Sequence, residues 1–121
     1  MSLTNAGEDR LLNLFKGDGP YYLALYTTAP TDAGGGTEVS GGGYARQQVT
    51  FGNPSSGSMS NTAAIAFPTA TGSWGTVKGW GLVDAATSGS LVWYGTVDAA
   101  KEIAAGDIYR VDAGGLTLSM D

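Results

Sequence analysis

The sequence of 121 residues contains neither cysteine nor histidine. Without cysteine the chain has no disulfide framework, no thiol nucleophile and no thiolate metal ligand. Without histidine it has no imidazole that titrates near neutral pH, which the Ser-His-Asp and Cys-His mechanisms require. Zinc sites built from imidazole or thiolate are excluded for the same reason. We therefore expect a protein that is not an enzyme, with no metal and no cofactor.

Charged residues are scarce, at 14% of the chain, and eleven acidic residues against six basic ones give a net charge of −5. The basic residues are scattered and form no patch. A chain with so few cations neutralises few phosphates, so we expect no direct binding to nucleic acid. No apolar run approaches the roughly twenty residues of a membrane span, and no basic segment typical of a signal peptide opens the chain. We expect no membrane partner.

Glycine is abundant, with 20 residues that occur in clusters, which favours a β fold with many tight turns. Apolar and alternating runs predict strands at Tyr21–Tyr26, Tyr44–Phe51, Ala63–Phe67, Val77–Val83, Leu91–Val97, Ile108–Val111 and Leu116–Met120. The polar segment Gly52–Ser60 is predicted to be a loop. Short strands at regular intervals are typical of a sandwich. We predict a mainly β fold, an antiparallel β-sandwich of jelly-roll type, as a single domain over residues 1–121.

Residues 1–17 predict a short N-terminal α-helix, and residues 20–121 the sandwich. Thr4 or Asn5 is a candidate N-cap, and apolar residues follow at helical spacing. Gly17 stands where a C′ glycine would end the helix. A helix of about three turns is not stable alone, so it must dock on the domain or on a neighbouring subunit.

Two glycine triplets, residues 34–36 and 41–43, bracket Thr37-Glu38-Val39-Ser40 and lead into Tyr44-Ala45-Arg46. We call residues 34–46 the glycine loop. Neither triplet is followed by the Lys-Ser/Thr of a phosphate-binding loop, and the chain contains no Gly-x-Gly-x-x-Gly. Because glycine is favoured where φ is positive, the triplets predict a loop with a specified backbone path, or one that folds against a partner.

The glycine loop also carries a resemblance, together with the opening Met-Ser-Leu-Thr-Asn, the stretch from Tyr22 to Asp32 and the closing Ile103-Ala-Ala-Gly-Asp107. These pieces span nearly the whole chain. The chain resembles a family of small tailed-phage virion proteins commonly labelled tail-fibre proteins. The resemblance implies a structural component of a virion, made in the cytoplasm of the bacterial host, and it supplies no catalytic residue.

The aromatic residues allow a second interpretation, because flat aromatic faces stack on sugar rings. Trp74, in an apparent loop, is the best candidate for a glycan contact. Trp80 and Trp93 lie in strand patterns and indicate core or interface packing, which is also the favoured interpretation for tryptophan here. Gly79 and Gly81 on either side of Trp80 predict a close approach of another group, or a bulge.

Acidic residues suggest further alternatives. Asp98, Glu102 and Asp107 lie close enough in sequence to suggest a glycosidase pair, but a turn at 98–102 and an amide-capping Asp107 are favoured. Asp32 and Glu38 have oxygens suited to calcium, without EF-hand spacing. Glu38 and Arg46 would pair if the loop folds back, and a solvated loop with unpaired charges is the alternative.

We predict an interaction site, without catalytic or metal-binding residues, at Thr37, Glu38, Val39, Ser40, Tyr44, Arg46 and Trp74. The expected partners are further copies of the chain, with a trimer favoured, and other virion proteins. The predicted function is an exterior tail or fibre-type accessory protein. The alternatives are a capsid decoration (cement) protein and a carbohydrate-binding module that recognises a host surface glycan.

Overall fold

The structure, a computed structural model, describes residues 2–120. Thr4 is the N-cap of helix α1 (Asn5–Gly17): its side chain accepts a hydrogen bond from Gly7 N–H at 3.1 Å, so the predicted N-cap is confirmed. The expected C′ role of Gly17 is wrong. Gly17 is the last helical residue, and Asp18 caps the helix with φ of −84°.

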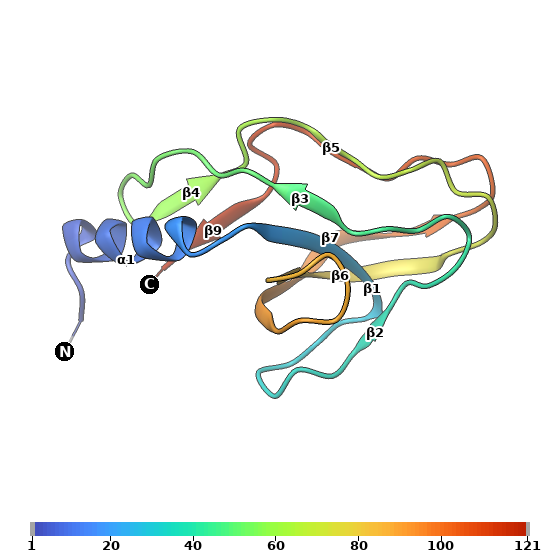
Figure 1. The fold of residues 1–121 in the computed structure, drawn as a ribbon, viewed down its shortest axis with the longest axis horizontal. Coiled ribbons are helices and arrows are strands. Elements are labelled where there is room, and N and C mark those ends of the chain that lie inside the picture. Colours follow the sequence, from blue (N-terminus) through green and yellow to red (C-terminus); the bar gives the residue numbers. More distant parts are fainter. Residues whose placement is uncertain (1, 121) are drawn as a thin grey trace.

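The helix docks on the β structure through one face. Leu12 is buried, and the ring of Phe15 stacks on Tyr21 with centroids 4.2 Å apart. Figure 1 shows α1 at the same end of the molecule as β4 (Ser58–Ser60) and β9 (Thr117–Ser119). This apolar packing supplies the stability that so short a helix lacks by itself.

The main sheet has five antiparallel strands. β1 (Tyr21–Thr28) pairs on one side with β6 (Gly75–Val83), which pairs with the edge strand β7 (Leu91–Ile103). The other side of β1 is shared by β3 (Gln47–Val49), opposite Tyr21–Leu23, and by β2 (Thr37–Glu38), opposite the far end of β1. The glycine loop therefore lies along this edge of the sheet.

Two small antiparallel pairs complete the β structure: β4 with β9, and β5 (Ile65–Ala66) with β8 (Arg110–Val111). Met59 and Leu118 are opposite each other in the first pair. Buried residues of these pairs join those of the main sheet in one cluster, which includes Leu23, Leu25, Leu82, Met59, Ile65 and Leu118. The mainly β, antiparallel fold with one N-terminal helix is confirmed. The layers are compatible with a sandwich, and jelly-roll topology remains a prediction.

The alternation in β1 and the glycines of β6 behave as predicted. Leu23 and Leu25 enter the main core, and Ala24 and Tyr26 are buried on the opposite face, so β1 is covered on both sides. At Gly79 an added Cβ would lie 2.8 Å from the Cβ of Ala29. Glycine at this position therefore permits a close approach, as the sequence predicted.

Several boundaries differ from the prediction. Within the expected strand Tyr44–Phe51 only Gln47–Val49 is a named strand, since Tyr44 and Arg46 bond to Glu38. The expected loop Gly52–Ser60 contains β4, because Met59 is buried opposite Leu118. The expected turn at 98–102 is wrong, as β7 continues through it to pair with the start of β6.

Among residues 2–120, no helix has the length and apolarity needed to cross a membrane.

Candidate functional site: a clamped glycine loop

All six glycines of the two triplets have positive φ, between 58° and 88°. Such a conformation is strained for residues with a Cβ, so the triplets specify the path of the loop. At Gly42 an added Cβ would also lie 2.9 Å from Cδ1 of Trp74. The prediction of a specified backbone path is confirmed within this chain itself.

Glu38 and Arg46 form the predicted ion pair. Arg46 Nη2 donates to Glu38 Oε1 at 2.8 Å, and Arg46 Nε donates to Glu38 Oε2, also at 2.8 Å. The side chain of Glu38 is only 24% exposed, and that of Arg46 only 12%. A bidentate pair of this kind is stronger and more specific in geometry than a single exposed ion pair. The alternative of a solvated loop with unpaired charges is therefore wrong.

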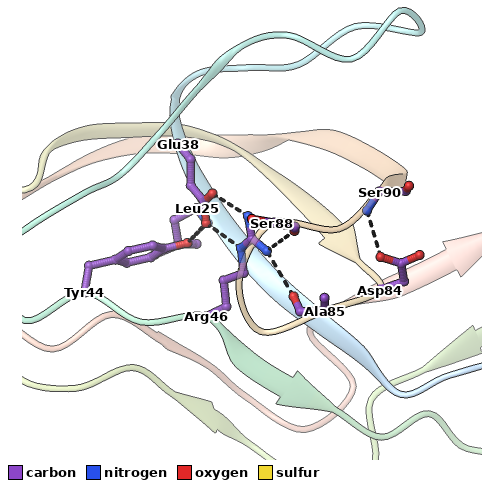
Figure 2. A network of polar contacts seen from close by, with 8 residues as sticks. All are labelled: Leu25, Glu38, Tyr44, Arg46, Asp84, Ala85, Ser88 and Ser90. Atoms are coloured by element: carbon purple, nitrogen blue, oxygen red, sulfur yellow. Dashed lines mark hydrogen bonds and ion pairs between the residues drawn. The ribbon is translucent and has the colours of Figure 1, made fainter.

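Arg46 also reaches the loop that joins β6 to β7. Its Nη1 donates to the carbonyl oxygens of Ala85 and Ser88, at 3.0 and 2.7 Å. That loop is closed by Asp84, whose Oδ1 accepts from Ser90 N–H at 2.7 Å. Figure 2 shows the guanidinium between the carboxylate of Glu38 and this loop. One arginine thus joins two loops that are far apart in sequence.

Tyr44 completes the network, which we call the polar clamp (Glu38, Tyr44 and Arg46). The Tyr44 hydroxyl donates to Glu38 Oε2 at 2.6 Å and accepts from the backbone N–H of Leu25 at 3.0 Å. Leu25 lies in β1 between the stretches that pair with β3 and β2. The hydroxyl therefore provides the acceptor that a neighbouring strand would otherwise supply.

The clamp shifts the acidity of its members. Burial raises the pKa of Glu38, but the hydrogen bonds from Arg46 and Tyr44 and the Arg46 charge outweigh it, so the pKa lies below its ordinary value. Burial and the hydrogen bond to Glu38 raise the pKa of the Tyr44 hydroxyl. The hydrogen bond to Glu38 likewise raises the pKa of Arg46. At neutral pH the clamp holds one carboxylate, one guanidinium and one neutral phenol.

Aromatic rings pack against Tyr44 of the polar clamp. The ring of Tyr44 stacks on Phe67 at 6.1 Å and meets Trp74 edge-on at 5.4 Å. Trp74 is buried, and its Nε1 donates to the carbonyl oxygen of Gly42 at 2.9 Å. The interpretation of Trp74 as an exposed sugar platform is therefore wrong, because its faces are covered by the core.

A hollow of about 370 Å³ lies between the glycine loop and the β6–β7 loop. It is lined on one side by Glu38, Ser40 and Arg46, and on the other by Thr87 and Ser88. Of the seven predicted interaction residues, Thr37 and Ser40 are exposed, whereas Val39 and Trp74 are buried. The interaction site itself stays a prediction.

Other acidic candidates have structural partners or lie apart. Asp107 Oδ2 accepts from Ala104 N–H at 2.9 Å, which is the capping role that the sequence favoured. Asp32 accepts from the Tyr94 hydroxyl, while Glu38 is held in the clamp. Within residues 2–120, no three acidic side chains gather in a way that could hold a metal ion.

The sequence did not point to the β6–β7 loop as part of this site. Ala85 and Ser88 contribute carbonyl oxygens, and a backbone acceptor leaves no trace in residue type. The available signal in the sequence was the dipeptide Ser88-Gly89, which is typical of a turn. In the structure both residues have positive φ. It indicates a tight turn but not its neighbour.

Comparison with known proteins identifies the family of the chain. Residues 2–119 match the protein family described as "Podophage GP4 fiber I protein gp80". A comparison with curated proteins gave no match. The match covers nearly the whole chain and confirms the resemblance to phage tail-fibre-type virion proteins. The chain belongs to the podophage GP4 fiber I protein gp80 family and is a structural, fibre-type component of a phage virion.

Proposed function

We propose that this protein is a non-enzymatic accessory component on the exterior of the fibre apparatus, and that it acts by self-association and by docking on other virion proteins. The observation that carries the proposal is the polar clamp. It holds a glycine-rich loop in one conformation, with Ser40 and Thr37 exposed beside the hollow. A rigid loop binds a partner without a large loss of conformational entropy.

Docking through the glycine loop is tested by a matched pair of substitutions. Ser40→Lys adds a charge and a long side chain to the exposed loop, while Ser119→Lys makes the same change on β9, on another part of the surface. We expect both variants to melt like the wild type. Incorporation into particles, measured by quantitative mass spectrometry of purified virions, should fall only for Ser40→Lys. Equal incorporation of the two variants would place the docking surface elsewhere.

Self-association is supported by the outer surface of α1. On α1, Leu14 is 71% exposed and Leu11 is 43% exposed, and Leu3, which precedes the helix, is 50% exposed. Leu11 and Leu14 are three residues apart and therefore share one side of the helix. Exposed apolar clusters of this kind mark interaction sites on soluble proteins. A trimer is the form that we propose.

Sedimentation velocity of the purified protein measures the oligomeric state. We expect a trimer that Leu14→Ser dissociates, while Ile108→Ser, at a second exposed apolar residue, leaves the trimer intact. A wild-type protein that is monomeric at all concentrations tested would contradict self-association. Dissociation by Ile108→Ser alone would contradict the role of α1.

A further inference from the structure

A groove of about 450 Å³ lies between the face of the main sheet and the segment that carries β8 and β9. Its apolar lining includes Trp80, Val97 and Tyr109 together with leucines of the core, and Thr96, Asp98 and Thr117 provide polar groups. Sites for small ligands have volumes of roughly 300–1,000 Å³ and combine an apolar lining with a few polar groups. The groove is separate from the polar clamp, none of whose residues line it.

The indole of Trp80 is a fixed surface in this groove. An added Cβ at Gly95 would lie 2.7 Å from Trp80 Nε1 and 2.8 Å from Cε2 and Cζ2, so the indole lies directly against the glycine backbone. Trp80 is nevertheless only partly buried. A ring that is supported by the backbone and still reaches the groove loses little entropy when a ligand stacks on it.

The polar groups of the groove suit hydroxyl-bearing ligands. Asp98 is exposed and forms no ion pair within residues 2–120, so both of its carboxylate oxygens are available as acceptors. The hydroxyls of Thr96 and Thr117 donate or accept. None of the described residues that line the groove is Lys or Arg. With a net charge of −5, the chain disfavours anionic ligands.

We propose that this groove binds a neutral sugar residue of a surface polysaccharide. The apolar face of the sugar ring stacks on Trp80, and its hydroxyls donate to Asp98. The inference is independent of docking through the glycine loop, because it concerns different residues and a different class of ligand. It also differs from the sequence-based interpretation, which placed the glycan contact at Trp74.

The test uses the full chain with lipopolysaccharide and capsular polysaccharide purified from the strain on which the phage is propagated. Affinity electrophoresis and quenching of tryptophan fluorescence measure binding. We expect retardation by one of these polysaccharides. Asp98→Asn should reduce the affinity about tenfold, because the acceptor loses its charge and a hydrogen bond to a neutral oxygen is weaker. Glu102→Gln, on the same strand but outside the groove, is the matched control and should bind like the wild type.

Three results would overturn the proposal. The first is that the wild type binds neither of the two polysaccharides. The second is equal binding by Asp98→Asn and Glu102→Gln. The third is a loss of incorporation into particles for Asp98→Asn without any effect on polysaccharide binding, because the groove would then be occupied by another virion protein. Since Asp98 is exposed, Asp98→Asn should fold normally, and its melting temperature checks this.

Discussion

The Tyr44 hydroxyl accepts a hydrogen bond, at 3.0 Å, from the backbone N–H of Leu25, at a point of the β1 edge between its partners β2 and β3. A side chain of the glycine loop thus supplies the acceptor that a neighbouring strand would otherwise provide. The same hydroxyl donates to Glu38, which is paired with Arg46. The loop path and the edge of the sheet are therefore determined together, and the following predictions test this connection.

Tyr44→Phe removes the hydroxyl and leaves the N–H of Leu25 without its acceptor. We expect a loss of about 1–3 kcal/mol in the free energy of unfolding, the cost of an unsatisfied buried donor. Urea denaturation measures it. Tyr109→Phe is the control, because Tyr109 lies outside the polar clamp and should change stability by less. Equal losses for the two variants would contradict the role of the Tyr44 hydroxyl.

Glu38 and Arg46 should behave as one unit. Glu38→Gln and Arg46→Gln each remove a charged partner of a bidentate pair, and we expect each to lower the free energy of unfolding by about 1.5–3 kcal/mol. The double variant should lose less than the sum of the two, because residues in one network are coupled. A double-mutant cycle from urea denaturation gives the coupling, and strict additivity would show that the pair is not energetically linked.

The depressed pKa of Glu38 predicts a dependence of stability on pH. The stabilisation is fully present above the ordinary pKa of 4.5 and is lost as the pH falls through the lower pKa of the folded state. Thermal unfolding between about pH 6 and pH 2 should therefore show the wild type approaching the stability of Glu38→Gln at the acidic end. A constant difference between the two proteins would contradict this prediction.

Gly41→Ala and Gly42→Ala separate backbone strain from packing. Both glycines have positive φ, at 74° and 58°, so each substitution should cost about 1–2 kcal/mol in strain. At Gly41 the added Cβ meets no atom of residues 2–120 within 4 Å, whereas at Gly42 it meets the indole of Trp74. We expect Gly42→Ala to lose more stability and to change the tryptophan emission spectrum. Equal losses with unchanged emission would contradict the packing against Trp74.

The sequence predicted the strands that carry long apolar or alternating runs. The two-residue alternation of Tyr21–Tyr26 predicted β1, because the side chains of a strand point to opposite faces and both sets were apolar. The sequence also predicted the constrained glycine loop, since six clustered glycines indicate positive φ. The pairing of Glu38 with Arg46 was one of two open interpretations, because residue types do not specify whether a loop folds back.

The sequence by itself therefore determined the mainly β composition, the N-terminal helix and the existence of a constrained loop, since these depend on local propensity and periodicity. Only the tertiary structure decided that Trp74 and Val39 are buried, that β4 forms in a polar segment, and that Arg46 reaches the carbonyl oxygens of Ala85 and Ser88. These outcomes depend on contacts between residues distant in sequence. Backbone groups have no residue-specific signature, and burial depends on which segments pack together.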